Sequence, residues 1–251
     1  MKMTKEEWKA LNDRIMLTLR STQYPVAMKF IKTEEDWEKI PNINYCQNKA
    51  SVCKTIGMAA HFQETFGLDR EHFSGPYCAI NNGCMPVDEE WLQGSILYKK
   101  PTPWHHDQED AKKHIAENAK VLPEEPYLGV VCSSLSNCDV EEPDVIALRL
   151  PTQAAFHFLA GYVESDYQKL NFTFSGESNC SDTWMETLKN GKPGLSLGCR
   201  GDRATGGLEF GEVQVTMTTE QVLKALDGVD TVTENGIKYP YFPVCLYKEN
   251  F

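Results

Sequence analysis

The residues best suited to chemistry lie in the glycine-rich loop of residues 191–203, GKPGLSLGCRGDR. Cys199 stands there between Gly198 and Gly201, and Arg200 follows it directly. Glycines at this density let successive backbone N–H groups form a concave nest, and iron–sulfur centres are among the groups that such nests hold. A thiolate beside a guanidinium group should also have a lowered pKa. The alternative is a tight turn that carries a small buried thiol.

Cys199 is one of nine cysteines in a chain of 251 residues. The first residues, MKMTKEEWKALNDRIM, contain no apolar signal core, and no run approaches the ~18 apolar residues of a membrane span. The sequence therefore predicts a cytoplasmic protein with no membrane partner. In a reducing compartment, many cysteines indicate metal or redox chemistry rather than a disulfide framework. A net charge of −11 argues against nucleic-acid binding.

Four thiolates can hold an iron–sulfur cluster or a tetrahedral zinc ion. The chain has no C-x2-C pair, so neither the familiar ferredoxin spacing nor a zinc ribbon is present. It also has no G-x-S-x-G motif, phosphate-binding loop or dinucleotide fingerprint. A metal site in this chain would have to collect its ligands from distant segments.

The elements that must position such ligands alternate between helices and strands, which favours a single compact α/β domain over residues 1–251. Its core would be a mixed α+β sheet with helices packed on it. Helix 4–20 is expected as an N-terminal extension and residues 75–120 as a loop-rich insertion that begins with an irregular loop over 75–90. Apolar periodicity and capping patterns predict the following ranges. Helices are predicted at 4–20, 33–39, 49–66, 107–118, 151–161, 181–188 and 219–226, and strands at 25–31, 127–133, 144–150, 170–175, 194–198 and 212–218. The aromatic tail, residues 239–251, is expected to pack on the core.

Several segments together resemble a known family. They are PVAMKF after the first helix, VCKTIGMAA with Cys53, GPYCA with Cys78, PDVIALRLPTQAAF, SGESNC with Cys180, and SLGCRGDR with Cys199. Their order and spacing are similar to those of the uncharacterised cysteine-rich family called domain of unknown function 169, which occurs widely in anaerobic bacteria and archaea. The resemblance extends from about residue 24 to residue 226. It implies four recurrent cysteines at these positions and a suspected iron–sulfur cluster.

The local context of the four cysteines suits that role. Cys53 is expected on a helix, Cys78 and Cys199 in loops, and Cys180 at the start of a helix, where unpaired N–H groups favour a thiolate. Gly198 and Gly201 could add N–H donors, which cluster sulfurs accept. We therefore expect a 4Fe–4S cluster on these four residues, with zinc as the alternative metal.

Three arginines are candidates for binding an anionic substrate, because a guanidinium group forks onto a carboxylate or a phosphate. Arg200 and Arg203 lie beside the expected cluster, and Arg149 ends an apolar strand. The alternative for each of them is a structural ion pair with one of the 36 acidic residues.

The leading hypothesis is an iron–sulfur protein of anaerobic metabolism that works in electron transfer or in reductive or Lewis-acid chemistry on a small molecule. Its partners would be a small molecule or a redox protein, and the oligomeric state, a homo-oligomer included, stays open. One alternative is a binding module that is stabilised by zinc or free of metal. The other is a thiol redox enzyme that uses Cys84, Cys132 or Cys138. The sequence assigns no role to Cys46, Cys84, Cys132, Cys138 or Cys245.

Overall fold

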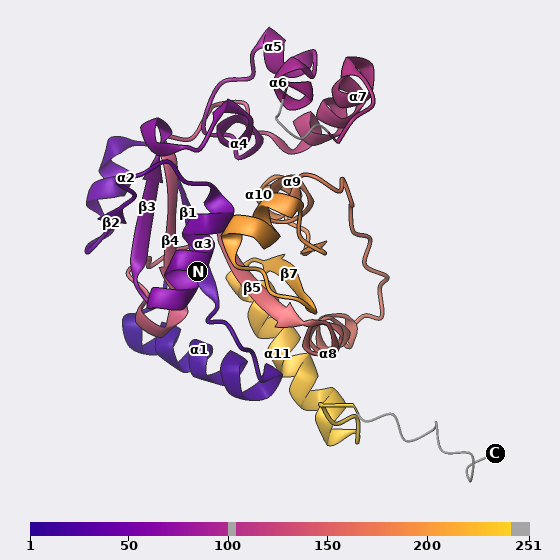
Figure 1. The fold of residues 1–251 in the computed structure, drawn as a ribbon. Helices are drawn as coiled ribbons and strands as arrows, with labels where there is room; N and C mark the ends of the chain where they lie inside the picture. Colours follow the sequence, from indigo (N-terminus) through magenta and orange to yellow (C-terminus); the bar gives the residue numbers. More distant parts are fainter. Residues whose placement is uncertain (100–103, 242–251) are drawn as a thin grey trace, which may run out of the picture.

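The computed structural model describes residues 1–99 and 104–241. Cys245 and most of the aromatic tail lie outside the described residues. Within them, the chain forms a mixed sheet with helices on both faces, which confirms the predicted α/β class (Figure 1). None of the helices in these two ranges is long and apolar enough to cross a bilayer.

The described strands form one seven-stranded sheet in the order β2-β3-β4-β1-β5-β7-β6. The β2–β3 pair is parallel, and all other pairs are antiparallel. The strands are β1 (Val26–Ile31), β2 (Asn44–Tyr45), β3 (Thr65–Asp69), β4 (Gly129–Ser134), β5 (Val145–Pro151), β6 (Gly194–Ser196) and β7 (Glu212–Met217).

Helices cover both faces because the central strands are apolar on both sides. In β1, Val26, Met28 and Phe30 enter one core, and Ala27 and Ile31 enter the other. Such two-sided burial is typical of strands in the middle of a layered sheet. The α-helices are α1 (Lys5–Leu19), α2 (Glu34–Glu38), α3 (Val52–Phe62), α4 (Pro76–Asn81), α5 (Glu89–Leu92), α6 (Ser95–Tyr98), α7 (Gln108–Asn118), α8 (Thr152–Val163), α9 (Asn179–Asp182), α10 (Trp184–Asn190) and α11 (Thr219–Glu234).

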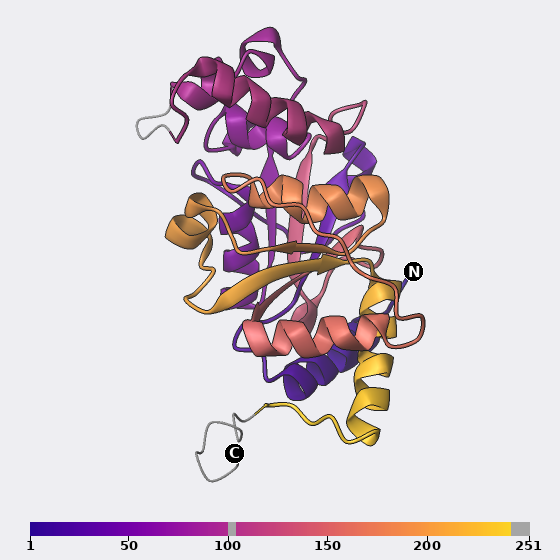
Figure 2. The ribbon, with the colours of Figure 1, turned by 90° about the vertical axis from the view of Figure 1, so that its right-hand side faces the viewer.

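The helices α1, α8 and α11 share one core with the sheet, and α3, α10 and the 75–120 segment share the other. Figure 2 shows α8 and α1 on one side of the sheet and α10 on the opposite side. Thr4 begins α1 with a reciprocal capping box, and the helix buries Trp8, Leu11, Ile15 and Leu19. The predicted N-terminal helix is therefore part of one helical layer.

The described residues of the 75–120 segment contain more helix than expected. It forms α4 to α7, which are grouped at one end of the molecule (Figure 1). The expected loop over 75–90 is wrong at its start, because Pro76 occupies the first turn of α4 directly after Gly75. A proline at that position has a suitable fixed φ and no N–H group to leave unpaired.

Other predicted elements also differ from the structure; the helix predicted over 219–226, for example, continues to Glu234. The helix expected over 49–66 ends at Phe62, because Gln63 adopts a left-handed conformation with φ of 58° and the chain continues into β3. The strand expected over 170–175 is absent, and Phe174 in that segment is exposed. The backbone N–H of Ser175 instead donates to the carboxylate of Asp182, so a side chain takes the place of a neighbouring strand.

Candidate functional site

A cavity of about 800 Å³ lies where the starts of α3 and α4 meet α9 and the glycine-rich loop. All four predicted ligands line it: Cys53, Cys78, Cys180 and Cys199. We call it the cysteine cavity. Its ligands come from four segments spread over about 150 residues, so only the folded chain brings them together.

Each of the four cysteines lies at or just before the first turn of a helical segment. Cys53 is the second residue of α3, Cys78 the third of α4, and Cys180 the second of α9. Cys199 directly precedes a helical stretch over 200–206, which ends in a π-helical turn. The N–H groups of a first turn have no partner inside the helix, so they are free to face a negatively charged sulfur.

The thiols of Cys53 and Cys199 interact directly. A hydrogen bond from Cys53 is the main reason why the pKa of Cys199 falls to about 6, and the backbone N–H groups of Asp202 and Asn179 lower it further. The Asp202 nitrogen lies 3.4 Å from the Cys199 sulfur. The same contact raises the pKa of Cys53, with burial as the second cause. One proton is therefore held on Cys53 and a thiolate is favoured on Cys199.

Burial is also the main cause of a raised pKa at Cys180, followed by the charges of Cys78 and Cys199. Like charges that share a desolvated site disfavour each other's ionised form. Three sulfur atoms are thus close enough to influence one another electrostatically. A cation among them would remove this repulsion.

A buried ion pair behind the cavity joins three of the four cysteine segments. The guanidinium group of Arg149 donates to the Asp202 carboxylate at 2.9 Å and to the backbone oxygen of Cys53 at 3.1 Å. Asp202 also accepts from the Asn179 side chain at 2.8 Å, next to Cys180. Arg149 is 3 % exposed and Asp202 is fully buried. The pair therefore sets the relative positions of the Cys53, Cys180 and Cys199 segments.

Cys78 is held by a separate contact. The side-chain amide of Asn82, one helical turn further on, donates to the Cys78 backbone oxygen at 2.8 Å and lies 3.7 Å from its sulfur. The Asn82 oxygen accepts from the indole N–H of Trp184 at 2.7 Å, which fixes the amide. The sequence reasoning missed this anchor because it placed Cys78 in a loop. The proline at the start of α4 was the signal that could have revealed the helix.

The glycines near the cysteines differ in role. Gly201 lines the cysteine cavity, whereas Gly198 lies outside its lining. Gly198 has φ of 80°, and a Cβ on it would collide with Leu208. Gly57 of α3 touches the backbone of Gly206 so closely that a Cβ would lie 2.1 Å from the Gly206 oxygen. This close approach brings Cys53 and the loop of Cys199 together.

Of the three candidate arginines, only Arg200 lines the cysteine cavity, where it faces Glu177 at 4.0 Å. Arg203 donates to the backbone oxygens of Leu197, Glu209 and Glu212. Arg149 is engaged by the contacts described above. Arg149 therefore makes the structural ion pair that the sequence left open as the alternative, whereas the contacts of Arg203 are to backbone oxygens.

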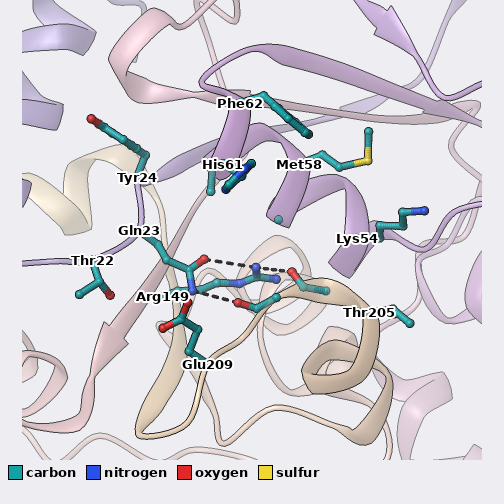
Figure 3. Close-up of a pocket in the computed structure, with 14 residues that line it drawn as sticks. Thr22, Gln23, Tyr24, Lys54, Met58, His61, Phe62, Arg149, Thr205 and Glu209 are labelled. Atoms are coloured by element: carbon teal, nitrogen blue, oxygen red, sulfur yellow. Dashed lines mark hydrogen bonds between the residues drawn. The ribbon is translucent and has the colours of Figure 1, made fainter.

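A second cavity of about 460 Å³ has Arg149 in its lining (Figure 3). Figure 3 shows Tyr24, His61 and Phe62 on one side of Arg149 and Glu209 on the other. Lys54 belongs to the linings of both cavities, as does Thr205. These two residues form the ridge between the cavities.

The other described cysteines lie outside the cysteine cavity. Cys46, Cys84, Cys132 and Cys138 are buried, and burial is the first cause of a raised pKa at each of them. For Cys138 the pKa rises to about 11. Thiols of this kind are weak nucleophiles at neutral pH. Their surroundings therefore give no support to the alternative of a thiol enzyme.

Within residues 1–99 and 104–241, no group of three His, Cys, Asp or Glu side chains is close enough to hold a single metal ion. A structural zinc ion needs all its ligands around one atom, at ~2.3 Å for sulfur. In a four-iron cluster each thiolate binds its own iron.

The model of one protein family, described as uncharacterised ArCR, matches residues 14–228. The match covers all four cysteines of the cavity and most of the chain, and it confirms the resemblance identified from the sequence. No curated protein and no solved structure matches the chain.

Proposed function

Since the chain belongs to this cysteine-rich family, domain of unknown function 169, we propose that it is an iron–sulfur protein in which Cys53, Cys78, Cys180 and Cys199 hold a 4Fe–4S cluster. One observation carries the proposal. Four thiols from distant segments line a single cavity, and they are the four that the sequence singled out.

The residues around the thiols fit such a group. Four cysteine sulfurs are the commonest ligand set of these clusters, and hydrogen bonds to the sulfurs tune the reduction potential. The Asp202 N–H and the Asn82 amide already lie near cysteine sulfurs.

A bound cluster would supply a one-electron carrier. A cavity of about 800 Å³ has the volume of many water molecules, each with a share of ~30 Å³ in the liquid. A core of eight atoms would leave much of it open. We therefore propose electron transfer or reductive chemistry on a small molecule bound beside the cluster, in the reducing cytoplasm of an anaerobe, with a redox protein as electron donor. Lewis-acid chemistry would need an iron with an open coordination position, which four cysteine ligands do not leave.

Two sets of residues would hold the cluster ligands in place. The Arg149–Asp202 pair holds three of the thiols in place, and Asn82 holds the fourth.

The test is the metal content of the full chain, produced and purified without oxygen. We expect about four iron atoms and four acid-labile sulfides per chain, the content of one 4Fe–4S cluster. One equivalent of zinc with no sulfide would favour the alternative of a zinc-stabilised binding module. Neither metal in the anaerobic protein would overturn the proposal.

A further inference from the structure

The charges around the cysteine cavity are opposite to those of the whole chain. The net charge is −11, but the cavity is lined by three cations, Lys49, Lys54 and Arg200, and by one carboxylate, Glu177. Cations predominate among the charged Lys, Arg and Glu side chains of the lining, and such an excess attracts small molecules of the opposite sign. The lining therefore favours an anion.

Lys54 is the cation best placed to meet that anion. Lys49 donates to the backbone oxygen of Glu71, and Arg200 faces Glu177 at 4.0 Å. Lys54 is exposed at the rim and makes no ion pair with any residue of the described ranges. It lines the same cavity as Cys53, so an anion bound to it there would lie near the proposed cluster.

Deeper in the cavity, Asn81 presents a hydrogen-bond acceptor. Asn81 is 1 % exposed and lines the cavity, and its amide nitrogen lies 3.4 Å from Ser178. Its side-chain oxygen has no protein donor within the described residues. By contrast, both amide atoms of its neighbour Asn82 are engaged. Buried acceptors are unfavourable unless they meet a donor, so Asn81 is suited to an O–H or N–H group of a ligand.

We propose that the cysteine cavity binds a small organic acid that also carries an O–H or N–H group, with Lys54 contacting the carboxylate and Asn81 accepting from the donor. The inference rests on the proposed function, because it takes this acid to be the substrate of the same cavity. Ala50, Pro76 and Ile96 also line the cavity and provide apolar contact for the body of the molecule.

The test compares two acids that differ by one hydroxyl group, 3-phenyllactate and 3-phenylpropionate. Their dissociation constants are measured by titration calorimetry on the full chain. We expect phenyllactate to bind roughly tenfold more tightly, the effect of about one hydrogen bond to a buried acceptor. Equal affinities, or no binding of either acid, would overturn the proposal.

Two variants separate the two contacts. Lys54→Gln should raise the dissociation constants of both acids roughly tenfold. Lys192→Gln replaces an exposed lysine outside the cavity and should change neither constant. Asn81→Leu should remove the preference for phenyllactate but leave the binding of phenylpropionate. If Asn81→Leu does not fold, the ratio of the two dissociation constants in the unaltered protein still tests the proposal. An unchanged affinity in Lys54→Gln would contradict the role of this lysine.

The same samples are assayed for iron, so that the two proposals fail separately. Selective binding of phenyllactate by an iron-free protein would retain the ligand class and reject the cluster. A protein with four irons that binds neither acid would retain the cluster and reject the ligand class.

Discussion

The protein buries cysteines in two different regions. Cys84, Cys132 and Cys138 lie outside the cysteine cavity, and burial is the first cause of a raised pKa at each of these thiols. The four cysteines of the cavity lie at helix starts, and at Cys199 hydrogen bonds overcome burial and lower the pKa to about 6. Burial alone therefore does not mark a site. What distinguishes the cavity is the set of polar groups that face the sulfur atoms.

The largest effect should come from replacing one sulfur in each region. Cys180→Ser should abolish iron binding or leave a labile, incomplete centre, because one of four cluster ligands is lost. Cys132→Ser should keep the iron content of the unaltered protein, because Cys132 lies on β4 outside the cavity. Iron and sulfide are measured per folded chain after anaerobic purification. Equal iron losses in the two variants would contradict the proposal that the cavity cysteines bind iron and Cys132 does not.

The next largest effect should come from the ion pair behind the cavity. Arg149→Leu leaves Asp202 buried without its cation, and such a loss costs about 3–5 kcal/mol of the free energy of unfolding. The variant should also lose iron affinity, since Arg149 fixes the backbone of Cys53. Denaturant unfolding of the iron-free protein measures the first effect separately from the second.

The double variant Arg149→Leu/Asp202→Leu is the matched control. Removing both charges should restore part of the stability, because no buried charge is left uncompensated. If Arg149→Leu were as stable as the unaltered protein, the Arg149–Asp202 pair would not organise the cavity.

The fold class was accessible from the sequence because apolar periodicity reports burial. β1, β5 and β7 have uninterrupted or alternating apolar residues and were predicted to within one or two positions. The short helices α4, α5 and α6 were missed, because four to six residues are too few to show a helical period. Their stability comes from packing against the core rather than from their own sequence.

The sequence predicted which cysteines line the candidate site. It did not predict the residues that hold those cysteines in place. Cysteine is rare and chemically distinctive, so family resemblance and a glycine-rich neighbourhood were enough to select four of nine. The roles of Asp202, Asn82 and Asn81 depend on contacts between residues as far as about 100 positions apart. A single sequence contains no local signal for such contacts.

A smaller effect is expected where α3 touches the turn after Cys199. Gly57→Ala would place a Cβ 2.1 Å from the Gly206 oxygen, so the two segments must separate. Overpacking of this kind costs about 1–3 kcal/mol, and the separation should lower the affinity for iron. Unfolding free energy and iron content are both measured.

Gly75→Ala is the matched control for this substitution. Gly75 also lines the cysteine cavity, but its backbone is extended and a Cβ would meet nothing within 4 Å. It should change stability by less than about 0.5 kcal/mol, as most substitutions away from strained or crowded positions do. If the two variants behave alike, close approach at Gly57 is not what joins Cys53 to the loop of Cys199.

The smallest effect is expected for Cys132→Val, which replaces this thiol by an apolar side chain instead of a polar one. Cys132 is fully buried on β4 and pairs with Met28 of β1 and Phe66 of β3. A free cysteine in such a place behaves as a small hydrophobic residue, and swaps of similar volume usually cost less than about 1.5 kcal/mol. Iron content should not change. A loss above about 3 kcal/mol, or any loss of iron, would show that Cys132 belongs functionally with the cavity cysteines, and the division between the two regions would then have to be redrawn.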